Sequence, residues 1–146
     1  MNRIYLLTGA AGLLGSNISR QLVDAGKTVR ALVLKGDLAA RYIPDAVQVV
    51  YGDLLDRSSL ENLFTVPADS EVVVIHSASI VTLDPSPSPK VHAVNVDGTR
   101  NIVEMCLRHK VKKLVYISST GAIAELPHGQ KIREVDHFLP ADGLEG

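Results

Sequence analysis

Runs of mostly apolar residues recur along the chain and are separated by polar or glycine-containing segments. The runs cover residues 4–7, 29–34, 47–51, 71–76 and 113–118. A strand that is apolar at successive positions, instead of at alternate ones, is typical of a parallel sheet with helices on both faces. We therefore expect five buried strands.

Between these runs the apolar residues recur every three or four positions, which is the period of an α-helix. Residues 13–25 form the first such segment, and Gly26 follows it at the position of a left-handed C-cap. Residues 58–61 read Ser-Ser-Leu-Glu, the spacing of a capping box, and predict that Ser58 starts a short helix. That helix carries Leu60, Leu63 and Phe64.

A longer helix is predicted after residue 88, with Ser88 as its N-cap and Pro89 as its first residue. Its stripe at helical spacing consists of Val91, Val94, Gly98, Ile102, Cys106 and His109. The segment before it, residues 84–89, contains three prolines and is therefore expected to be a loop.

The alternation of strands and helices predicts an α/β fold, a Rossmann-type doubly wound parallel sheet of about five strands. The periodicity stops after Thr120. We expect one dinucleotide-binding domain over residues 1–120, lacking the later strands and the substrate domain, followed by a loop or partly disordered tail over 121–146.

Composition narrows the class of protein. The 146 residues are 46% hydrophobic, which suits one globular domain, and the net charge of −1 gives no sign of a nucleic-acid or membrane partner. The single cysteine, Cys106, is interpreted as a reduced thiol in the core. No leader or membrane-spanning segment is recognisable, so a cytoplasmic protein is expected.

Three glycines follow the first strand and open the first helix. Gly9 is expected to permit a tight turn, Gly12 to let the backbone approach a phosphate, and Gly15 to let the helix pack closely on the strand. A helix N-terminus presents free N–H groups to an anion. The expected pyrophosphate contacts are Gly9, Gly12, Leu13, Leu14 and Gly15. A P-loop is excluded, because no Gly-Lys-Ser/Thr follows, and a turn needed only for packing is the structural alternative.

The chain resembles the extended short-chain dehydrogenases/reductases, including the NAD-dependent epimerase/dehydratase and dihydroflavonol-reductase-like members. The resemblance spans residues 3–122. It rests on five motifs: Thr-Gly-Ala-Ala-Gly-Leu-Leu-Gly at 8–15, Gly-Asp-Leu at 52–54, His-Ser-Ala at 76–78, Asn-Val-Asp-Gly-Thr at 95–99, and Tyr-Ile-Ser-Ser-Thr at 116–120. The resemblance implies that a nicotinamide dinucleotide is the cofactor.

Further cofactor contacts are expected where other strands end. Asp53, with Leu54, follows the third strand, where its carboxylate can accept from an adenine amino group; an Asx turn is the alternative. His76, Ala78 and Ser79 are expected beside the nicotinamide ribose, with no proton-transfer role for His76. Asn95 and Gly98 are interpreted as structural.

The end of the second strand is expected to select the dinucleotide. A carboxylate there suits the 2′-hydroxyl of NAD, and a basic side chain suits the 2′-phosphate of NADP. Lys35 is the first polar side chain in this region, with Arg30 earlier, whereas Asp37 arrives late, behind a glycine. The sequence favours NADP over NAD, with a merely solvated Lys35 as the alternative.

Thr120 is the one candidate catalytic side chain, with an ordinary hydroxyl at the end of a strand as the alternative. The resemblance implies that it hydrogen-bonds the substrate hydroxyl or carbonyl and that Ser118 lies at the cofactor. In related enzymes the tyrosine of a Tyr-x-x-x-Lys motif gives or takes the proton, and the lysine lowers the pKa of that tyrosine. None of the tyrosines here has a lysine four positions later, namely Tyr5, Tyr42, Tyr51 and Tyr116.

We therefore expect the cofactor-binding part of a reductase, epimerase or dehydratase that acts on a secondary alcohol or ketone, either in a sugar nucleotide or in a small hydrophobic carbonyl compound. The chain alone is expected to be inactive and, because incomplete sheets expose apolar surface, to form a homo-oligomer. No metal site is expected. The alternative is a non-catalytic redox sensor or scaffold that binds the dinucleotide without turnover.

Overall fold

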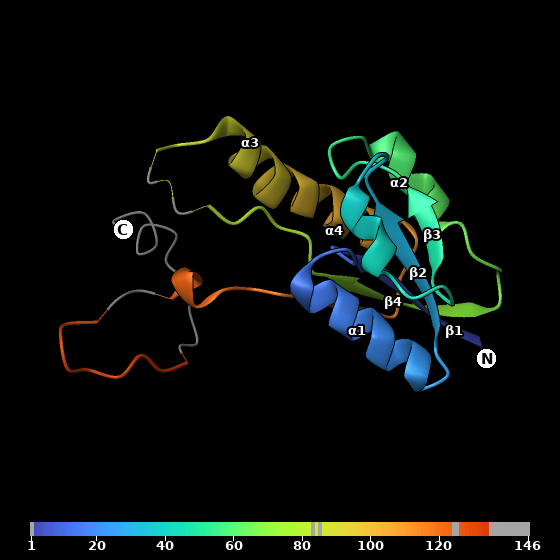
Figure 1. The fold of residues 1–146 in the computed structure, drawn as a ribbon, viewed down its shortest axis with the longest axis horizontal. Helices are drawn as coiled ribbons and strands as arrows, with labels where there is room; N and C mark the ends of the chain where they lie inside the picture. Colours follow the sequence, from blue (N-terminus) through green and yellow to red (C-terminus); the bar gives the residue numbers. More distant parts are fainter. Residues whose placement is uncertain (1, 83, 85, 124–125, 135–146) are drawn as a thin grey trace. The chain divides into compact units, whose positions relative to one another are not determined.

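Five strands form one parallel sheet in the order β3-β2-β1-β4-β5. Figure 1 labels β1 to β4 of this sheet. The strands are β1 (Asn2–Thr8), β2 (Thr28–Val33), β3 (Gln48–Tyr51), β4 (Ser70–His76) and β5 (Lys113–Tyr116). The computed structural model describes residues 2–82, 84, 86–123 and 126–134. This sheet confirms the predicted Rossmann-type parallel fold, and the strands differ from their expected bounds by one or two residues at most ends.

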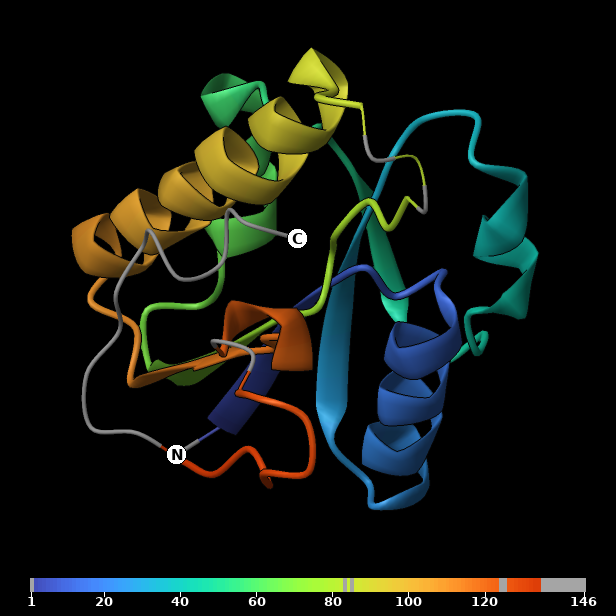
Figure 2. The ribbon, with the colours of Figure 1, turned by 90° about the vertical axis from the view of Figure 1, so that its left-hand side faces the viewer.

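Helices cover both faces of the sheet (Figure 2). On one face lie α1 (Leu13–Asp24) and the short 3₁₀ helix η1 (Leu38–Tyr42). On the other lie α2 (Arg57–Phe64) and a continuous helical run composed of α3 (Pro89–His92), the π-helical turn η2 (Ala93–Gly98) and α4 (Thr99–Arg108).

The core has two parts, one on each face of the sheet. Leu6 of β1 belongs to the part under α2 and α4, and its neighbour Leu7 belongs to the part under α1. Successive side chains of a strand point to opposite faces, so a strand with two covered faces has to be apolar throughout. Cys106 is buried in the first part, and burial raises the pKa of its thiol to about 11. The prediction of a core thiol is confirmed.

The end of α1 matches the sequence prediction. Gly26 has a φ of +69°, its N–H donates to the carbonyl of Val23, and the N–H of Lys27 donates to the carbonyl of Leu22. These two bonds make a Schellman motif, in which a glycine tolerates the left-handed conformation that ends the helix.

The start of α2 differs from the prediction. Asp56, not Ser58, is the N-cap, and its carboxylate accepts from the N–H of Ser58 at 3.0 Å. The Ser58 hydroxyl also donates to it at 2.6 Å, which lowers the pKa of Asp56. Glu61 pairs with Arg108 instead of closing a capping box. The prediction of a capping box was therefore wrong, because a carboxylate two residues earlier already satisfies the first turn.

The long helix begins as predicted and then departs from ideal geometry. The Ser88 hydroxyl accepts from the N–H of Val91, and Pro89 is the first helical residue. The π-helical turn in the middle was not expected. It inserts one extra residue, which a pattern of apolar positions does not reveal; such turns often occur at functional sites.

Arg30, considered above as a basic residue near the dinucleotide, serves the fold instead. Its guanidinium donates to the backbone carbonyls of Asn62, Leu63 and Thr65 at the end of α2. The last carbonyls of a helix lack partners within it, so this side chain acts as a C-terminal cap.

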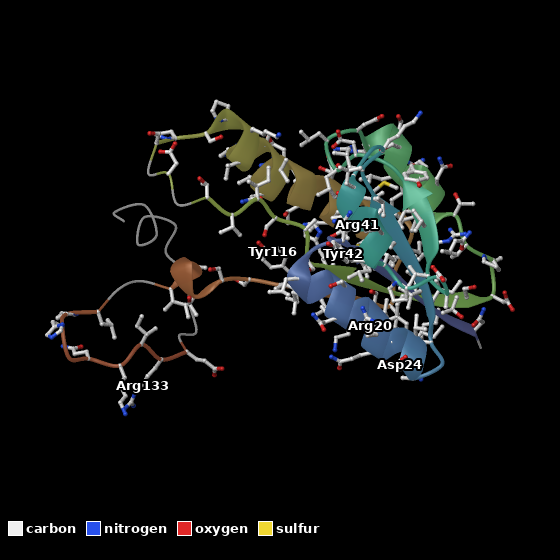
Figure 3. All side chains as sticks on the ribbon, viewed as in Figure 1. Arg20, Asp24, Arg41, Tyr42, Tyr116 and Arg133 are labelled. Carbon is white, nitrogen blue, oxygen red and sulfur yellow. The ribbon has the colours of Figure 1, made fainter. Side chains whose placement is uncertain are left out.

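Replacing Arg30 with methionine is expected to lower the free energy of unfolding by about 1–3 kcal/mol, because three backbone carbonyls, one of them on the buried Leu63, lose a charged donor. Arg20→Met is the matched control, because Arg20 is exposed on α1 and has no hydrogen bond or ion pair to another described residue (Figure 3). Urea unfolding of the two variants measures the difference. Equal losses of stability would show that Arg30 is not a cap.

The chain divides into two compact units, Met1–Tyr116 and Ile117–Gly146. In the described part of the second unit, residues 117–123 and 126–134, the regular element is the 3₁₀ turn η3 (Thr120–Ala122). The predicted tail over 121–146 lies partly outside the described residues, as do positions 83 and 85 near the proline-rich loop. Among the helices of the described segments, none has the length and apolarity to span a membrane.

Candidate functional site

A cavity of about 290 Å³ opens at the carboxyl end of the sheet. Residues that end or follow β1, β2, β3 and β4 line it: Thr8, Gly9, Ala10, Ala11, Leu32, Val33, Leu34, Asp37, Gly52, Asp53, Leu54, Ala78 and Ile80, joined by Lys90 and Val94 of the long helix. From β1 the chain proceeds outward to β3, and it then returns to place β4 on the other side of β1. Open α/β sheets bind ligands at such a change of direction.

The glycine turn after β1 forms one wall of the cavity. Gly9 has a φ of +72°, which confirms the tight turn, and its carbonyl accepts from the N–H of Gly12 at 3.0 Å. Gly12 is the N-cap of α1 and supplies no side-chain cap. The first N–H groups of α1 therefore lack an intrahelical partner, and Leu13 beside them is 87% exposed. This geometry suits a bound anion.

Gly15 has a packing role. A Cβ atom at this position would lie 2.0 Å from the carbonyl oxygen of Gly9. The absence of a side chain lets the first turn of α1 rest directly on the turn after β1. The expectation that Gly15 permits close packing is confirmed.

Asp53 makes the Asx turn considered as the alternative above. Its Oδ1 accepts from the N–H of Leu55 at 2.9 Å, and its own N–H donates to the Ser59 hydroxyl at 2.9 Å. The side chain is exposed at the cavity, so the second carboxylate oxygen remains available. The turn thus holds the carboxylate where the adenine contact is predicted, and the two interpretations are compatible.

The end of β2 places Asp37, not Lys35, in the cavity wall. The Asp37 side chain caps η1 by accepting from the N–H of Ala39 at 2.9 Å. Gly36, with a φ of +85°, turns the chain between the two residues. Lys35 is exposed and does not line the cavity.

His76 is buried at the end of β4, with 1% of its surface exposed. Its Nδ1 lies 2.6 Å from the Thr8 hydroxyl, and its Nε2 lies 2.8 Å from the Thr99 hydroxyl. Burial lowers the pKa of the imidazole to about 4, so the ring is neutral near pH 7. Because both ring nitrogens have protein partners, the ring has no free group for the cofactor contact expected at His76.

The segment after His76 forms the opposite wall. The N–H groups of Ser77 and Ala78 each lie 3.2 Å from the Thr8 hydroxyl. Asn95 exchanges two hydrogen bonds with the backbone of Ile80, at 2.8 and 2.9 Å. The structural interpretation of Asn95 is confirmed. Ala78 and Ile80 line the cavity, whereas Ser79 is exposed outside it.

Gly98 also has the structural role expected of it. A Cβ atom there would lie 3.1 Å from the Cβ of Leu54, so the helix approaches the segment after β3 closely. This contact joins two sides of the cavity.

The remaining predicted residues lie outside the cavity. Gly12, Leu13, Leu14 and Gly15 adjoin it through the glycine turn. Ser118 and Thr120 belong to the second unit, so their roles stay predictions. No group of three or more metal-binding side chains occurs among the residues the structure describes.

Sequence reasoning missed several lining residues. Thr8, Leu34 and Gly52 lie at strand ends, and that position was the available signal. Lys90 and Val94 come from the long helix, and no motif pointed to them. Among the described residues that line the cavity, the ionisable ones are Asp37, Asp53 and Lys90.

Comparisons with known proteins agree with this geometry. The sequence model of the 3-beta hydroxysteroid dehydrogenase/isomerase family matches residues 6–143. Sterol demethylase protein B of Methylococcus capsulatus is 34% identical over 124 residues, covering 85% of this chain and 37% of that protein. Human 3 beta-hydroxysteroid dehydrogenase type 7 is 31% identical over 148 residues, covering 97% and 39%. The chain thus spans well under half of these relatives.

Among solved structures, UDP-glucose 4-epimerase of Thermus thermophilus, in complex with NAD, superposes with a TM-score of 0.80 at 28% identity. The match covers 97% of this chain and 46% of the epimerase. The shared fold is the amino-terminal α/β sheet described above.

Proposed function

Because the chain belongs to the 3-beta hydroxysteroid dehydrogenase/isomerase family, one of the extended short-chain dehydrogenases/reductases, we propose that it is the cofactor-binding part of a nicotinamide-dependent oxidoreductase or epimerase. The main support for this proposal is the cavity at the point where the strand order reverses, with the glycine turn as one of its walls. The relatives named above, one with NAD bound, support the cofactor class.

The residues fit a dinucleotide in distinct ways. The uncapped N-terminus of α1 and the bare Cα of Gly12 suit the pyrophosphate, which needs N–H donors and close backbone approach. Asp53 suits the adenine amino group, since it lines the cavity and only its Oδ1 is engaged, by the N–H of Leu55. The bound dinucleotide would supply or accept a hydride at its nicotinamide ring.

The cavity wall favours NAD over NADP, which reverses the preference drawn from sequence. Asp37 lines the cavity, and a carboxylate accepts well from a ribose 2′-hydroxyl but repels a 2′-phosphate. Lys35 does not line it, and Arg30 is occupied at α2. Lys90, the one cation among the described lining residues, lies on α3 and not at the end of β2, where the 2′ position is expected to be read. Titration of the same sample with both dinucleotides tests this choice.

The substrate of the whole protein is proposed to be a secondary alcohol or ketone. The names of the family and of the sterol-acting relatives favour a small hydrophobic compound over a sugar nucleotide. The chain alone is proposed to be inactive, because no Tyr-x-x-x-Lys pair occurs in it. Self-association likewise stays a proposal, tested by light scattering.

Replacing Asp53 with asparagine is expected to weaken NAD binding about tenfold, the equivalent of one good hydrogen bond. Asparagine keeps the oxygen that accepts from Leu55, but its amide nitrogen cannot accept from adenine. An NMR titration with NAD measures the dissociation constant. Asp45→Asn, at an exposed position outside the cavity, is the control. Unchanged affinity in Asp53→Asn would place the adenine elsewhere.

A further inference from the structure

A chain of three hydrogen-bonded side chains, two buried and one half-buried, connects the two walls of the cavity. Thr8 lies at the end of β1, His76 at the end of β4, and Thr99 at the start of α4. The three are joined by hydrogen bonds of 2.6 and 2.8 Å through the two nitrogens of the imidazole. The ring of Tyr116, the β5 partner of His76, stacks on the imidazole with centroids 5.8 Å apart.

The hydrogen bonds around His76 fix where its proton lies. A threonine hydroxyl has one donor and two acceptor lone pairs. The Thr8 hydroxyl oxygen already accepts from the N–H of Ala78 and from the N–H of Ser77, which it shares with the Thr8 carbonyl, so its proton is directed to Nδ1 of His76. Nδ1 therefore carries no proton.

The other side of the ring gives the complementary result. The Thr99 hydroxyl donates to the carbonyl of Asn95 at 2.7 Å, so its oxygen can only accept from Nε2 of His76. Nε2 therefore carries the proton. The imidazole is neutral, and both of its nitrogens are satisfied in this one tautomer.

The hydrogen bonds of His76 affect the cavity through the backbone of residues 77–78. The Thr8 hydroxyl holds the N–H groups of Ser77 and Ala78. This backbone is pressed against the glycine turn, since a Cβ on Gly9 would lie 2.7 Å from the nitrogen of Ala78. Displacement of residues 77–78 would therefore change the wall and the turn together.

We propose that His76 is a positioning residue of the dinucleotide site, fixed as the Nε2–H tautomer between Thr8 and Thr99, and that it holds residues 77–80 in the shape that binds the cofactor. The same hydrogen bonds form a closed ring, because the backbone carbonyl of Asn95 accepts from the Thr99 hydroxyl and the Asn95 side chain binds the backbone of Ile80. The effect of His76 on cofactor binding rests on the proposed function, whereas the assignment of its tautomer is independent of that function.

Long-range ¹H–¹⁵N NMR of the histidine rings tests the tautomer directly in the wild-type chain. His76→Gln identifies the signals of His76 among the five histidines. The expected spectrum shows a protonated Nε2 and an unprotonated Nδ1. A protonated Nδ1 near pH 7 would overturn the assignment, whatever the cofactor does.

Thr99→Val tests the positioning role, because valine keeps the shape of threonine and removes the acceptor of the Nε2 proton. NAD binding is expected to weaken about tenfold, since a buried donor loses its partner. Thr99→Ser, which restores the hydroxyl, should bind within about twofold of wild type. Thr28→Val, at an exposed position at the start of β2, is the surface control.

The outcomes separate this inference from the proposed function. NAD binding that is equal in wild type and Thr99→Val would overturn the positioning role alone. If wild type binds no dinucleotide, the proposed function fails. Amide hydrogen exchange then tests the inference. Thr99→Val is expected to accelerate exchange at Ser77 and Ala78, and Thr99→Ser is not. Equal exchange rates in both variants would overturn the inference.

Discussion

Replacing Gly15 with alanine is expected to destabilise the chain by about 3 kcal/mol or more and to abolish dinucleotide binding. The added Cβ would lie 2.0 Å from the carbonyl oxygen of Gly9 and 2.9 Å from the Cα of Ala10. Both are backbone atoms, so no side-chain rotation relieves the clash, and α1 has to move away from β1. The N-terminus of α1 would move with it.

Two opposing contributions determine whether Gly15→Ala raises or lowers the free energy of unfolding. In an exposed helix, alanine is about 1 kcal/mol more favourable than glycine. That gain is smaller than the cost of separating two packed backbone segments. Typical domains are stable by only about 5–15 kcal/mol, so a loss of this size leaves a substantial unfolded population.

Gly26→Ala is the matched control for Gly15→Ala. A Cβ on Gly26 would meet no atom within 4 Å, and only its φ of +69° opposes a side chain. Alanine there should cost about 1–2 kcal/mol and leave binding unchanged. Thermal and urea unfolding, with NAD titration, compare the two variants. Equal losses would mean that the close contact at Gly15 does not exist in solution.

Replacing Ile102 with alanine is expected to lower the free energy of unfolding by about 2–5 kcal/mol. The side chain is fully buried between α4 and the sheet, in the same cluster as Leu6 and Val74. Truncation removes apolar contacts and leaves a cavity that close-packed neighbours fill only in part.

Leu107→Ala is the control for Ile102→Ala on the same helix. Leu107 is 74% exposed, and alanine is a slightly better helix former, so stability should change by less than about 0.5 kcal/mol. Urea unfolding of both variants tests which face of α4 is buried. A larger loss at Leu107 would require a different packing of the helix.

The elements that were predictable from sequence are those in which local pattern and tertiary structure agree. Apolar runs identified the strands, because both faces of the sheet are covered. Helical spacing placed Ile102 and Cys106 in the core correctly, and Gly26 ended α1 as expected. In each case the residues within one short window carry the physical cause.

The features that were not predictable depend on residues far apart in the chain. Arg30 reaches the end of α2 more than 30 positions later, so its basic charge alone suggested a different role. His76 finds partners on β1 and α4, and neither is visible from the His-Ser-Ala motif. The spacing of apolar residues identifies a helix or strand, but it does not show which distant residue a long polar side chain contacts.

The site was predictable in outline and less so in detail. The strand order brings Gly9, Asp53 and Ala78 to one cavity, as parallel strands with covered faces require. Whether Asp37 or Lys35 lines the cavity depends on how Gly36 turns the chain after β2. Lys35 comes first in the sequence and was therefore expected at the cofactor, but the direction of the backbone places Asp37 in the cavity wall.

The most direct test of the proposed function is an NMR titration of the ¹⁵N-labelled 146-residue chain with NAD. The expected result is saturable binding, with the largest amide shifts at Gly9 to Leu14, Asp53 and Ala78. Weaker binding of NADP would support the role of Asp37. No saturable shift, or shifts that avoid the glycine turn, would contradict the assignment of this cavity as a nicotinamide dinucleotide site.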